Sequence, residues 1–282
     1  MHQIVLTDTQ LHALLHEDVP YGDLTTATLN IGEASGQLTF SARNAMTVCA
    51  IEEAARLLEL AGLSVTLHCQ SGMAVEAGTL LLHAQGKVCS LHRGWKIAQI
   101  LVETTSGIAS AMAQIVGELA QAGLNTPVAC TRKNLPGTKA LSCKAIRAGG
   151  GSMHRLGLSE TILIFPEHRL FLHESPAETV MRLKAALPEK KIVVEVKDME
   201  SARTWADAGV DVLQLEKFSV HTLADCAQQL SAHHRRPSLA AAGGVNAQNA
   251  VAYAKAGADL LVTSAPYYAK PADVQVTFTA ER

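Results

Sequence analysis

The chain has 282 residues, of which 48% are hydrophobic, 18% charged and only 4% aromatic, with a formal net charge of -2. This composition excludes a disordered or fibrous protein, and the near-neutral charge argues against nucleic-acid binding, which usually needs a broad basic face. Six cysteines are scattered without a C-x-x-C pair, so the sequence predicts neither a zinc site nor a redox motif. The length favours about two domains.

Targeting and membrane segments are not expected. The opening MHQIVLTDTQLHALLHEDV has no cationic segment followed by a long apolar run. No later window approaches the ~20 apolar residues that a bilayer-spanning helix needs. The sequence therefore predicts a cytoplasmic protein.

The first part of the chain mixes helical patterns with short strands. TDTQLHALLHEDV predicts a capped helix and IEEAARLLELAG a second helix, while GQLTFSA, SVTLHC and TLLLHAQG predict strands. This order indicates an N-terminal α/β sandwich domain over residues 1–107. The C-terminal tail, 268–282, is expected to pack on the same domain.

A long helical stretch over residues 89–122 is expected to join this domain to a second one. Beyond residue 125, six short apolar runs alternate with helical segments: VACT, TILIF, KIVVEV, DVLQLE, SLAAA and DLLVTS. Such alternation predicts a parallel sheet that closes toward a barrel. Six strands in about 140 residues are too few for an eight-fold barrel, so we expect an incomplete α/β barrel of about six parallel strands over 108–267.

The expected active groups lie where these strands end. VACT runs into Arg132 and Lys133, and KIVVEV carries Glu195, which a strand would place on the same side as Lys197. DVLQLE ends at Glu216 and is followed by Lys217. For each glutamate the alternative is a structural salt bridge.

Local positive charge is concentrated in one stretch. Residues 130–155, CTRKNLPGTKALSCKAIRAGGGSMHR, contain six Lys or Arg and no Asp or Glu. A focused cluster indicates a small polyanionic ligand held in a cleft. We interpret His154 and Arg155, after the triple glycine, as part of this anion clamp, although the glycines could be only a helix cap and link.

A phosphate site is predicted after SLAAA. Gly243 and Gly244 would let the backbone approach an anion, and a following helix capped by Asn246 would add its positive dipole end. The alternative is a simple tight turn.

Six motifs together resemble those of the quinolinate phosphoribosyltransferase family, also called nicotinate-nucleotide pyrophosphorylase (carboxylating). They are EDVPYGDLTT (17–26), HRGWKIAQILVETTSGIAS (92–110), TRKNLPGTK (131–139), GGGSMHRLGL (149–158), VVEV (193–196) and AAGGV (241–245). The resemblance spans nearly the whole chain. It implies the same two domains and a homodimer, and transfer of phosphoribose from phosphoribosyl pyrophosphate to a nitrogen acceptor with magnesium present.

Matching positions imply roles for individual residues. Arg93 resembles an arginine that the neighbouring subunit contributes, and Arg132, His154 and Arg155 resemble residues that bind the carboxylated substrate. Lys133 resembles a catalytic pyrophosphate contact. Glu195 and Glu216 match catalytic acids near the ribose and its Mg²⁺. Gly243, Gly244 and Ser264 would bind the 5'-phosphate.

Three departures from the family pattern change the expected acceptor. The usual K-D-N-H string is Phe165, Pro166, Glu167 and His168 here, so an aromatic ring replaces a carboxylate-binding lysine. Lys197 and Lys217 appear beside the retained acids. With Phe165, they are expected to contact a substrate other than quinolinate. These changes resemble a paralogous branch associated with molybdate uptake.

Two functions from different classes follow. The first is a phosphoribosyltransferase with a less carboxylated aromatic or heterocyclic acceptor; the second is a non-catalytic protein that binds an oxyanion such as molybdate, or a nucleotide. Retention of Glu195 and Glu216 favours the first, because a binder of anions gains nothing from carboxylates in its pocket. A Schiff-base aldolase using Lys197 or Lys217 is disfavoured, since only the barrel suggests it.

Overall fold

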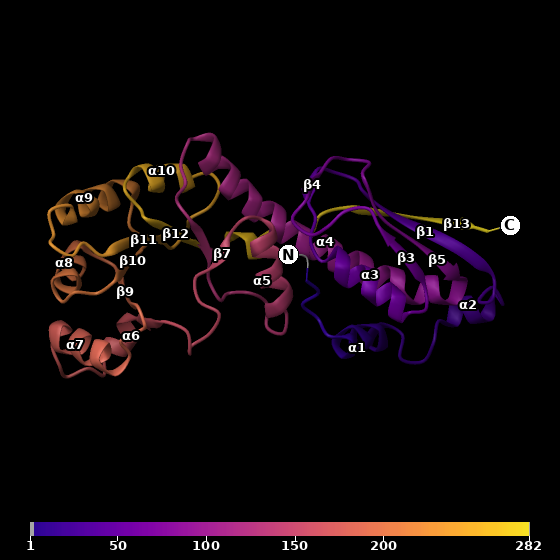
Figure 1. The fold of residues 1–282 in the computed structure, drawn as a ribbon, viewed down its shortest axis with the longest axis horizontal. Coiled ribbons are helices and arrows are strands. Elements are labelled where there is room, and N and C mark those ends of the chain that lie inside the picture. Colours follow the sequence, from indigo (N-terminus) through magenta and orange to yellow (C-terminus); the bar gives the residue numbers. More distant parts are fainter. Residues whose placement is uncertain (1–2, 282) are drawn as a thin grey trace. The chain divides into compact units, whose positions relative to one another are not determined.

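The computed structural model describes residues 3–281 and separates into two units (Figure 1). The first comprises Met1–Ala113, Leu135–Gly150 and Pro266–Arg282, and the second comprises Gln114–Asn134 and Gly151–Ala265. Helix α4 (Val88–Gln121) runs through residue 107, the expected boundary, and is shared by the two units. Leu135–Gly150, expected in the barrel, packs with the first unit.

The first unit contains a four-stranded antiparallel sheet in the order β13-β1-β5-β3. Its strands are β1 (Ser35–Ala42), β3 (Ser64–Leu67), β5 (Leu80–Lys87) and β13 (Val274–Ala280). The C-terminal strand β13 pairs with β1, where Phe40 lies opposite Val276. Strands β2 (Met46–Thr47) and β4 (Ala74–Val75) form a second, two-stranded sheet.

The helices of this unit follow from local signals. Besides part of α4, they are α1 (Asp8–Asp18), α2 (Leu24–Thr28), α3 (Ile51–Leu60) and α5 (Lys139–Ala148). α1 begins at a capping box, in which the Thr7 side chain accepts a hydrogen bond from the Gln10 backbone and the Gln10 side chain accepts one from Thr7.

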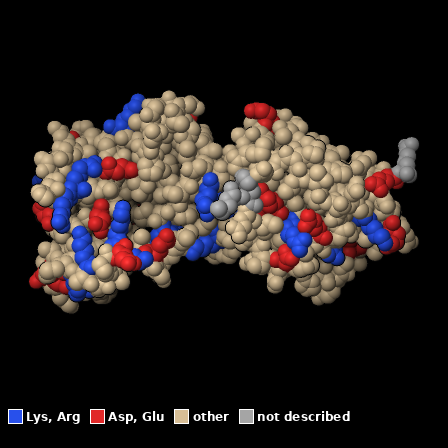
Figure 2. Space-filling model, viewed as in Figure 1, with Lys and Arg blue, Asp and Glu red and all other residues tan. Residues whose placement is uncertain are grey.

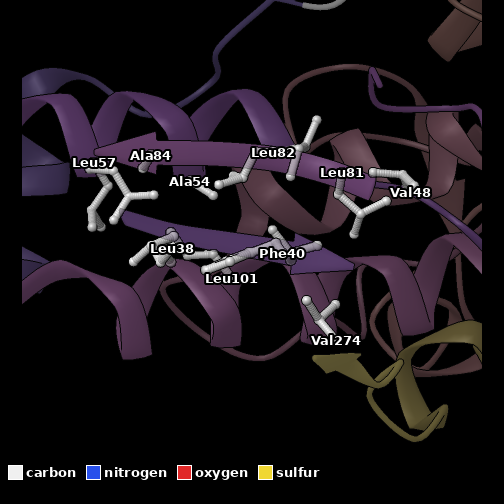
Figure 3. Close-up of a cluster of buried hydrophobic side chains, with 14 of the residues drawn as sticks. Leu38, Phe40, Val48, Ala54, Leu57, Leu81, Leu82, Ala84, Leu101 and Val274 are labelled. Atoms are coloured by element: carbon white, nitrogen blue, oxygen red, sulfur yellow. The ribbon is translucent and has the colours of Figure 1, made fainter. Parts of the chain in front are cut away.

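The core of the first unit lies between its sheet and its helices. Along β1, buried residues alternate with more exposed ones, because successive side chains of a strand point to opposite faces. Figure 3 shows Leu38 and Phe40 of β1 with Leu82 of β5, Leu57 of α3 and Leu101 of α4 in one cluster. Both the sheet and α4 therefore contribute to a single core.

Helix α4 is long and apolar enough, by length and composition, to cross a membrane. This differs from the expectation that no segment of the chain could cross a membrane. Its side chains Leu91, Ala98, Leu101 and Val102 are buried in the core of the first unit. Packing in that core accounts for the apolar composition of this part of the helix.

A buried ion cluster joins α3 to α5. The Lys144 ammonium lies 2.8 Å from Glu52 Oε2 and 2.6 Å from Glu53 Oε2, and Glu53 is 0% exposed. Backbone N–H groups of Ser71 and Val5 donate to Glu52 and Glu53 at 2.8 and 2.9 Å. Burial by itself would raise the pKa of Glu52, but hydrogen bonds from Lys144 and Ser71 hold that pKa below its ordinary value.

The second unit is built on a seven-stranded parallel sheet in the order β7-β6-β12-β11-β10-β9-β8. The strands are β6 (Val128–Cys130), β7 (Ser152–Met153), β8 (Ile162–Ile164), β9 (Ile192–Val196), β10 (Val212–Glu216), β11 (Ser238–Ala242) and β12 (Leu260–Thr263). The incomplete α/β barrel is confirmed, with one strand more than expected. β7 has only two residues after a glycine triplet, too short for a periodic signal.

Helices connect the parallel strands. They are α6 (Pro166–Arg169), α7 (Pro176–Ala186), α8 (Met199–Asp207), α9 (Val220–Leu230) and α10 (Ala250–Lys255), and a 3-10 helix, Ala265–Tyr268, follows β12. Strands β9 and β10 are almost continuously buried because both faces of a parallel sheet are covered. In such a sheet the carboxyl ends of the strands share one edge, where the polar residues follow.

Basic and acidic side chains lie next to one another on the visible surface. In Figure 2, blue basic and red acidic groups are interspersed on the face shown. That face presents no broad basic area of the kind that nucleic-acid binding requires.

Candidate active site

A cavity of about 840 Å³ opens at the carboxyl ends of the strands of the second unit. It brings together most residues that the sequence predicts for the site. These are Arg132, Lys133, His154, Arg155, Phe165, Glu195, Glu216, Lys217, Gly243, Gly244 and Ser264. They come from the ends of all seven strands of the sheet.

Cationic groups follow β6 and β7. Arg155 is only 6% exposed, and no salt bridge joins it to a carboxylate within residues 3–281. Burial, together with the charge of Arg132, lowers the pKa of Arg155. Burial also lowers the pKa of His154, with Arg155 adding to the effect, so this imidazole is uncharged at neutral pH. A buried guanidinium without a protein counterion favours an anionic ligand.

The two edge strands of the sheet approach each other across the cavity. The guanidinium carbon of Arg155, beyond β7, lies 5.7 Å from the centre of the Phe165 ring, beyond β8. Phe165 in turn stacks on His168 at 5.8 Å, and His168 Nδ1 accepts a hydrogen bond from the Phe165 backbone at 2.9 Å. Because β7 and β8 are the first and last strands of the sheet, this contact shows that the sheet is strongly curled.

Carboxylates occupy the ends of β9 and β10. Glu195 lies opposite Gln214 in the parallel register, and Gln214 Nε2 donates a hydrogen bond to Glu195 Oε2 at 2.8 Å. Burial raises the pKa of Glu195, and the negative charge of Glu216 raises it further. Neither glutamate forms a salt bridge in the described part of the chain. The structural salt bridge considered as an alternative for each glutamate therefore does not form among the described residues.

The turns after β10 and β11 hold an unusual backbone. Lys217 has a left-handed φ of 58°, and its N–H donates to the Ala242 carbonyl at 2.8 Å. Gly243 has a φ of +83°, and a Cβ there would lie 2.7 Å from Lys217 Cγ and 2.8 Å from Glu216 Oε1. Only glycine therefore fits beside these two side chains.

The phosphate prediction needs one correction. Asn246 does not cap the following helix: α10 begins at Ala250, its N-cap is Asn249, and it has only six residues. Asn246 and Asn249 instead shape the turn, since the Asn249 side chain accepts from the Asn246 N–H at 2.8 Å and donates to the Gly244 carbonyl at 3.0 Å. A phosphate site here would depend on the glycine turn and Ser264 and not on a helix dipole.

We expect Gly243→Ala to weaken binding of phosphoribosyl pyrophosphate by about tenfold or more, because the new methyl group displaces Glu216 and Lys217. Calorimetric titration would measure the affinity. Gly209→Ala is the matched control, because Gly209 has the same φ of +83° but no atom lies within 4 Å of the position that a Cβ would occupy. Equal losses in both variants would contradict the assignment.

Two predicted residues do not line this cavity. Lys197 is exposed, because β9 ends at Val196 and the alternation that would align Lys197 with Glu195 stops there. Its charge only opposes the burial-driven rise in the pKa of Glu195. Arg93 belongs to the first unit, where it lines a smaller cavity of about 260 Å³ with Asp23.

Sequence reasoning gave no role to several polar residues that line the larger cavity, among them Gln214 and Glu167. Gln214 is 6% exposed and is the one amide in the strand VLQLE. A lone amide in a buried strand is a usable signal, because it needs a hydrogen-bond partner. Glu167 follows Pro166 shortly after β8. It lies in the segment 165–168 that differs from the family's usual K-D-N-H string, and this difference could have indicated a role for it.

The carboxylates suit a magnesium ion that arrives with a phosphorylated ligand. Among the described residues, no group of three or more His, Cys, Asp or Glu side chains could hold a metal. Glu195 and Glu216 lie on adjacent strands, and their mutual repulsion contributes to the raised pKa of Glu195. Mg²⁺ binds proteins through one or two carboxylates, with phosphates and water completing its shell. The pair therefore fits that role.

Comparison with protein families identifies the class of this fold and site. Residues 23–106 match the N-terminal domain of quinolinate phosphoribosyl transferase, and residues 108–277 match its C-terminal domain. The chain belongs to the quinolinate phosphoribosyltransferase family, whose members are pentosyltransferases. The resemblance indicated by the motifs is confirmed, and the chain is a phosphoribosyltransferase of this family.

Within the family, the chain is similar to proteins that carry the name pyrophosphorylase ModD. It is 46% identical to that of Rhodobacter capsulatus, over 90% of this chain and 98% of the relative. It is 40% identical to that of Escherichia coli O6:H1, over 97% of each chain. Similarity to nicotinate-nucleotide pyrophosphorylase (carboxylating) of Mycobacterium leprae is 31%, over 89% of each.

Solved structures share the fold. The nicotinate-nucleotide pyrophosphorylase from Francisella tularensis superposes with a TM-score of 0.89 and 22% identity, over 99% of this chain and 98% of that one. NadC from Streptococcus pyogenes gives a TM-score of 0.88 with 24% identity, over 99% and 100%.

Proposed function

We propose that this protein transfers the 5-phosphoribosyl group of phosphoribosyl pyrophosphate to a ring nitrogen of an aromatic acceptor other than quinolinate, releasing pyrophosphate. The observation that carries the proposal is the content of one cavity. It combines the buried, unpaired Arg155, the adjacent carboxylates Glu195 and Glu216, and the glycine turn at Gly243. Each element matches one part of the reaction: acceptor anion, ribose and phosphate.

The charges of the cavity suit the transition state. The bond between ribose C1 and the pyrophosphate oxygen breaks as the bond to the acceptor nitrogen forms, so positive charge develops on the ribose and negative charge on the leaving group. The carboxylates of Glu195 and Glu216 would stabilise the ribose. Lys133 would bind the departing pyrophosphate. Mg²⁺, held by the two glutamates, would supply further positive charge to the phosphates.

The acceptor end differs from that of a quinolinate enzyme. Arg132, Arg155 and the neutral His154 can bind one anionic group together. Phe165 stands where the family's usual string has a lysine, so a second acceptor carboxylate would have no cation beside it. Because an unpaired carboxylate is costly to desolvate, quinolinate is disfavoured.

The same resemblance supports a proposal for the location and the assembly of this protein. We propose a cytoplasmic homodimer in which Arg93 of each subunit reaches the cavity of the other. Such an arrangement would give Arg93 a role, although it does not line the larger cavity of its own chain. A link to molybdenum uptake belongs to the same proposal and rests on the similarity to proteins named ModD.

Calorimetric titration with phosphoribosyl pyrophosphate, with and without Mg²⁺, tests the transferase proposal. We expect Mg²⁺-dependent binding near micromolar, about -8 kcal/mol, because Glu195 and Glu216 would hold the metal, whose charge would favour the donor's phosphates. Molybdate titrated under the same conditions is the control. Binding of molybdate without binding of the donor would contradict the proposal and favour a non-catalytic oxyanion binder.

A further inference from the structure

We propose that the acceptor carries a single anionic group and, at a second position, a hydrogen-bond-donating amine, which Glu167 binds. The inference rests on the proposed transfer function and names the chemistry of its acceptor. An amino-substituted heterocyclic monocarboxylate is the class of compound that this cavity fits.

The anionic group is assigned to the side of the cavity formed after β6 and β7. Arg155 is buried and lacks a protein carboxylate throughout the described chain, and Arg132 lies close enough for its charge to affect Arg155 in addition to burial. One carboxylate bound between the two guanidiniums would neutralise this buried charge. His154, beside them and uncharged, can donate a hydrogen bond to the same group.

Glu167 supplies the second polar group of the proposed acceptor site. Three acids line the cavity: Glu195 and Glu216, which follow strands β9 and β10, and Glu167, which lies in α6 after β8. No hydrogen bond or salt bridge engages the Glu167 side chain within residues 3–281. The turn that carries it is fixed by the hydrogen bond between the Phe165 backbone and His168. A positioned, unengaged carboxylate facing a ligand cavity is suited to accept from an N–H group.

Phe165 is close to both polar groups. Its ring centre lies 5.7 Å from the Arg155 guanidinium carbon, and Glu167 follows it by two residues in the chain. An aromatic acceptor with its carboxylate at Arg155 could therefore pack on Phe165 and present its far edge toward Glu167. A second carboxylate on that edge would be repelled by Glu167, whereas an amine would be attracted.

The alternative for Glu167 is a solvated surface acid, since the residue is exposed. It nevertheless lines the same cavity as Arg155, Glu195 and Glu216. A ligand in the cavity would reduce the solvent around Glu167 and strengthen this carboxylate's interactions. Removal of a solvated surface acid would not change the preference for an amino-substituted ligand, whereas removal of an amine-binding carboxylate would abolish it.

Calorimetric titrations of the full-length protein with five pyridines would test the inference. The ligands are pyridine-3-carboxylate, its 2-, 5- and 6-amino derivatives, and pyridine-2,3-dicarboxylate. We expect at least one amino isomer to bind about tenfold more tightly than the parent monocarboxylate, and the dicarboxylate to bind more weakly than the parent. Glu167→Ala should abolish the advantage of the amino isomer over the parent.

Two further variants sharpen the test. Glu189→Ala removes an exposed acid elsewhere in the second unit and should change nothing. The double variant Phe165→Lys/Glu167→Asn restores a cation and removes the acid, so it should reverse the preference and bind the dicarboxylate more tightly than the monocarboxylate. Both positions are at least partly exposed, which makes misfolding a minor concern.

The inference is overturned if no amino isomer exceeds the parent, if the advantage survives Glu167→Ala, if the wild-type protein binds the dicarboxylate as tightly as the monocarboxylate, or if none of the five ligands binds. Titration of the same preparations with phosphoribosyl pyrophosphate separates the two proposals. Donor binding without the amino preference rejects only the acceptor class, whereas loss of both rejects the transfer function.

Discussion

Glu216→Gln should lower the rate of pyrophosphate release from phosphoribosyl pyrophosphate by about 100- to 1,000-fold. The substitution keeps the size of the side chain but removes a negative charge from the side of the cavity where positive charge develops on the ribose. Release by slow hydrolysis of the donor, assayed as free pyrophosphate, measures this step without knowledge of the acceptor.

Donor binding by this variant should change much less than its rate. The phosphates are expected to bind through Lys133 and the turn at Gly243, which the substitution leaves in place. Calorimetry at saturating Mg²⁺, where the donor is expected to bind, would compare the affinities of the two proteins. Glu200→Gln, an exposed acid in α8, is the control. A Glu216→Gln protein that releases pyrophosphate at the wild-type rate would reject the catalytic role.

Lys144→Met should destabilise the first unit by about 3–5 kcal/mol, because it leaves Glu52 and Glu53 buried without their cation. Thermal unfolding of the full chain should then begin roughly 10 °C lower. Lys190→Met, at an exposed position, should have no comparable effect.

The loss of stability caused by Lys144→Met should also depend on pH. The depressed pKa of Glu52 means that its contribution to stability is present above the ordinary carboxyl pKa and is lost as the pH falls. Without Lys144, burial would raise the pKa of Glu52, so protonation would relieve the variant at mildly acidic pH. Unfolding at several pH values should therefore show the difference between the two proteins narrowing as the pH falls. A constant difference would indicate lost packing instead of an unpaired charge.

The sequence predicted most of the second unit because its strands are buried on both faces and appear as short apolar runs. It missed β7, since two residues carry no periodicity, and it placed Lys197 beside Glu195 on the assumption that β9 continued. Alternation along a strand holds only while the strand lasts. Asn246 was assigned to the helix start for a similar reason: the cap depends on the exact residue at which the helix begins, which is Ala250.

By itself, the sequence determined the two-part architecture, the family motifs and the loss of the lysine at position 165, because each is a local property of residue type and spacing. Only the tertiary structure decided what these residues meet. The curl of the sheet places Phe165 near Arg155, and the register of β9 and β10 pairs Gln214 with Glu195. Within residues 3–281, Arg155 is a buried cation that forms no salt bridge with a carboxylate. Its neighbours come from strands distant in the chain, and no local pattern encodes them.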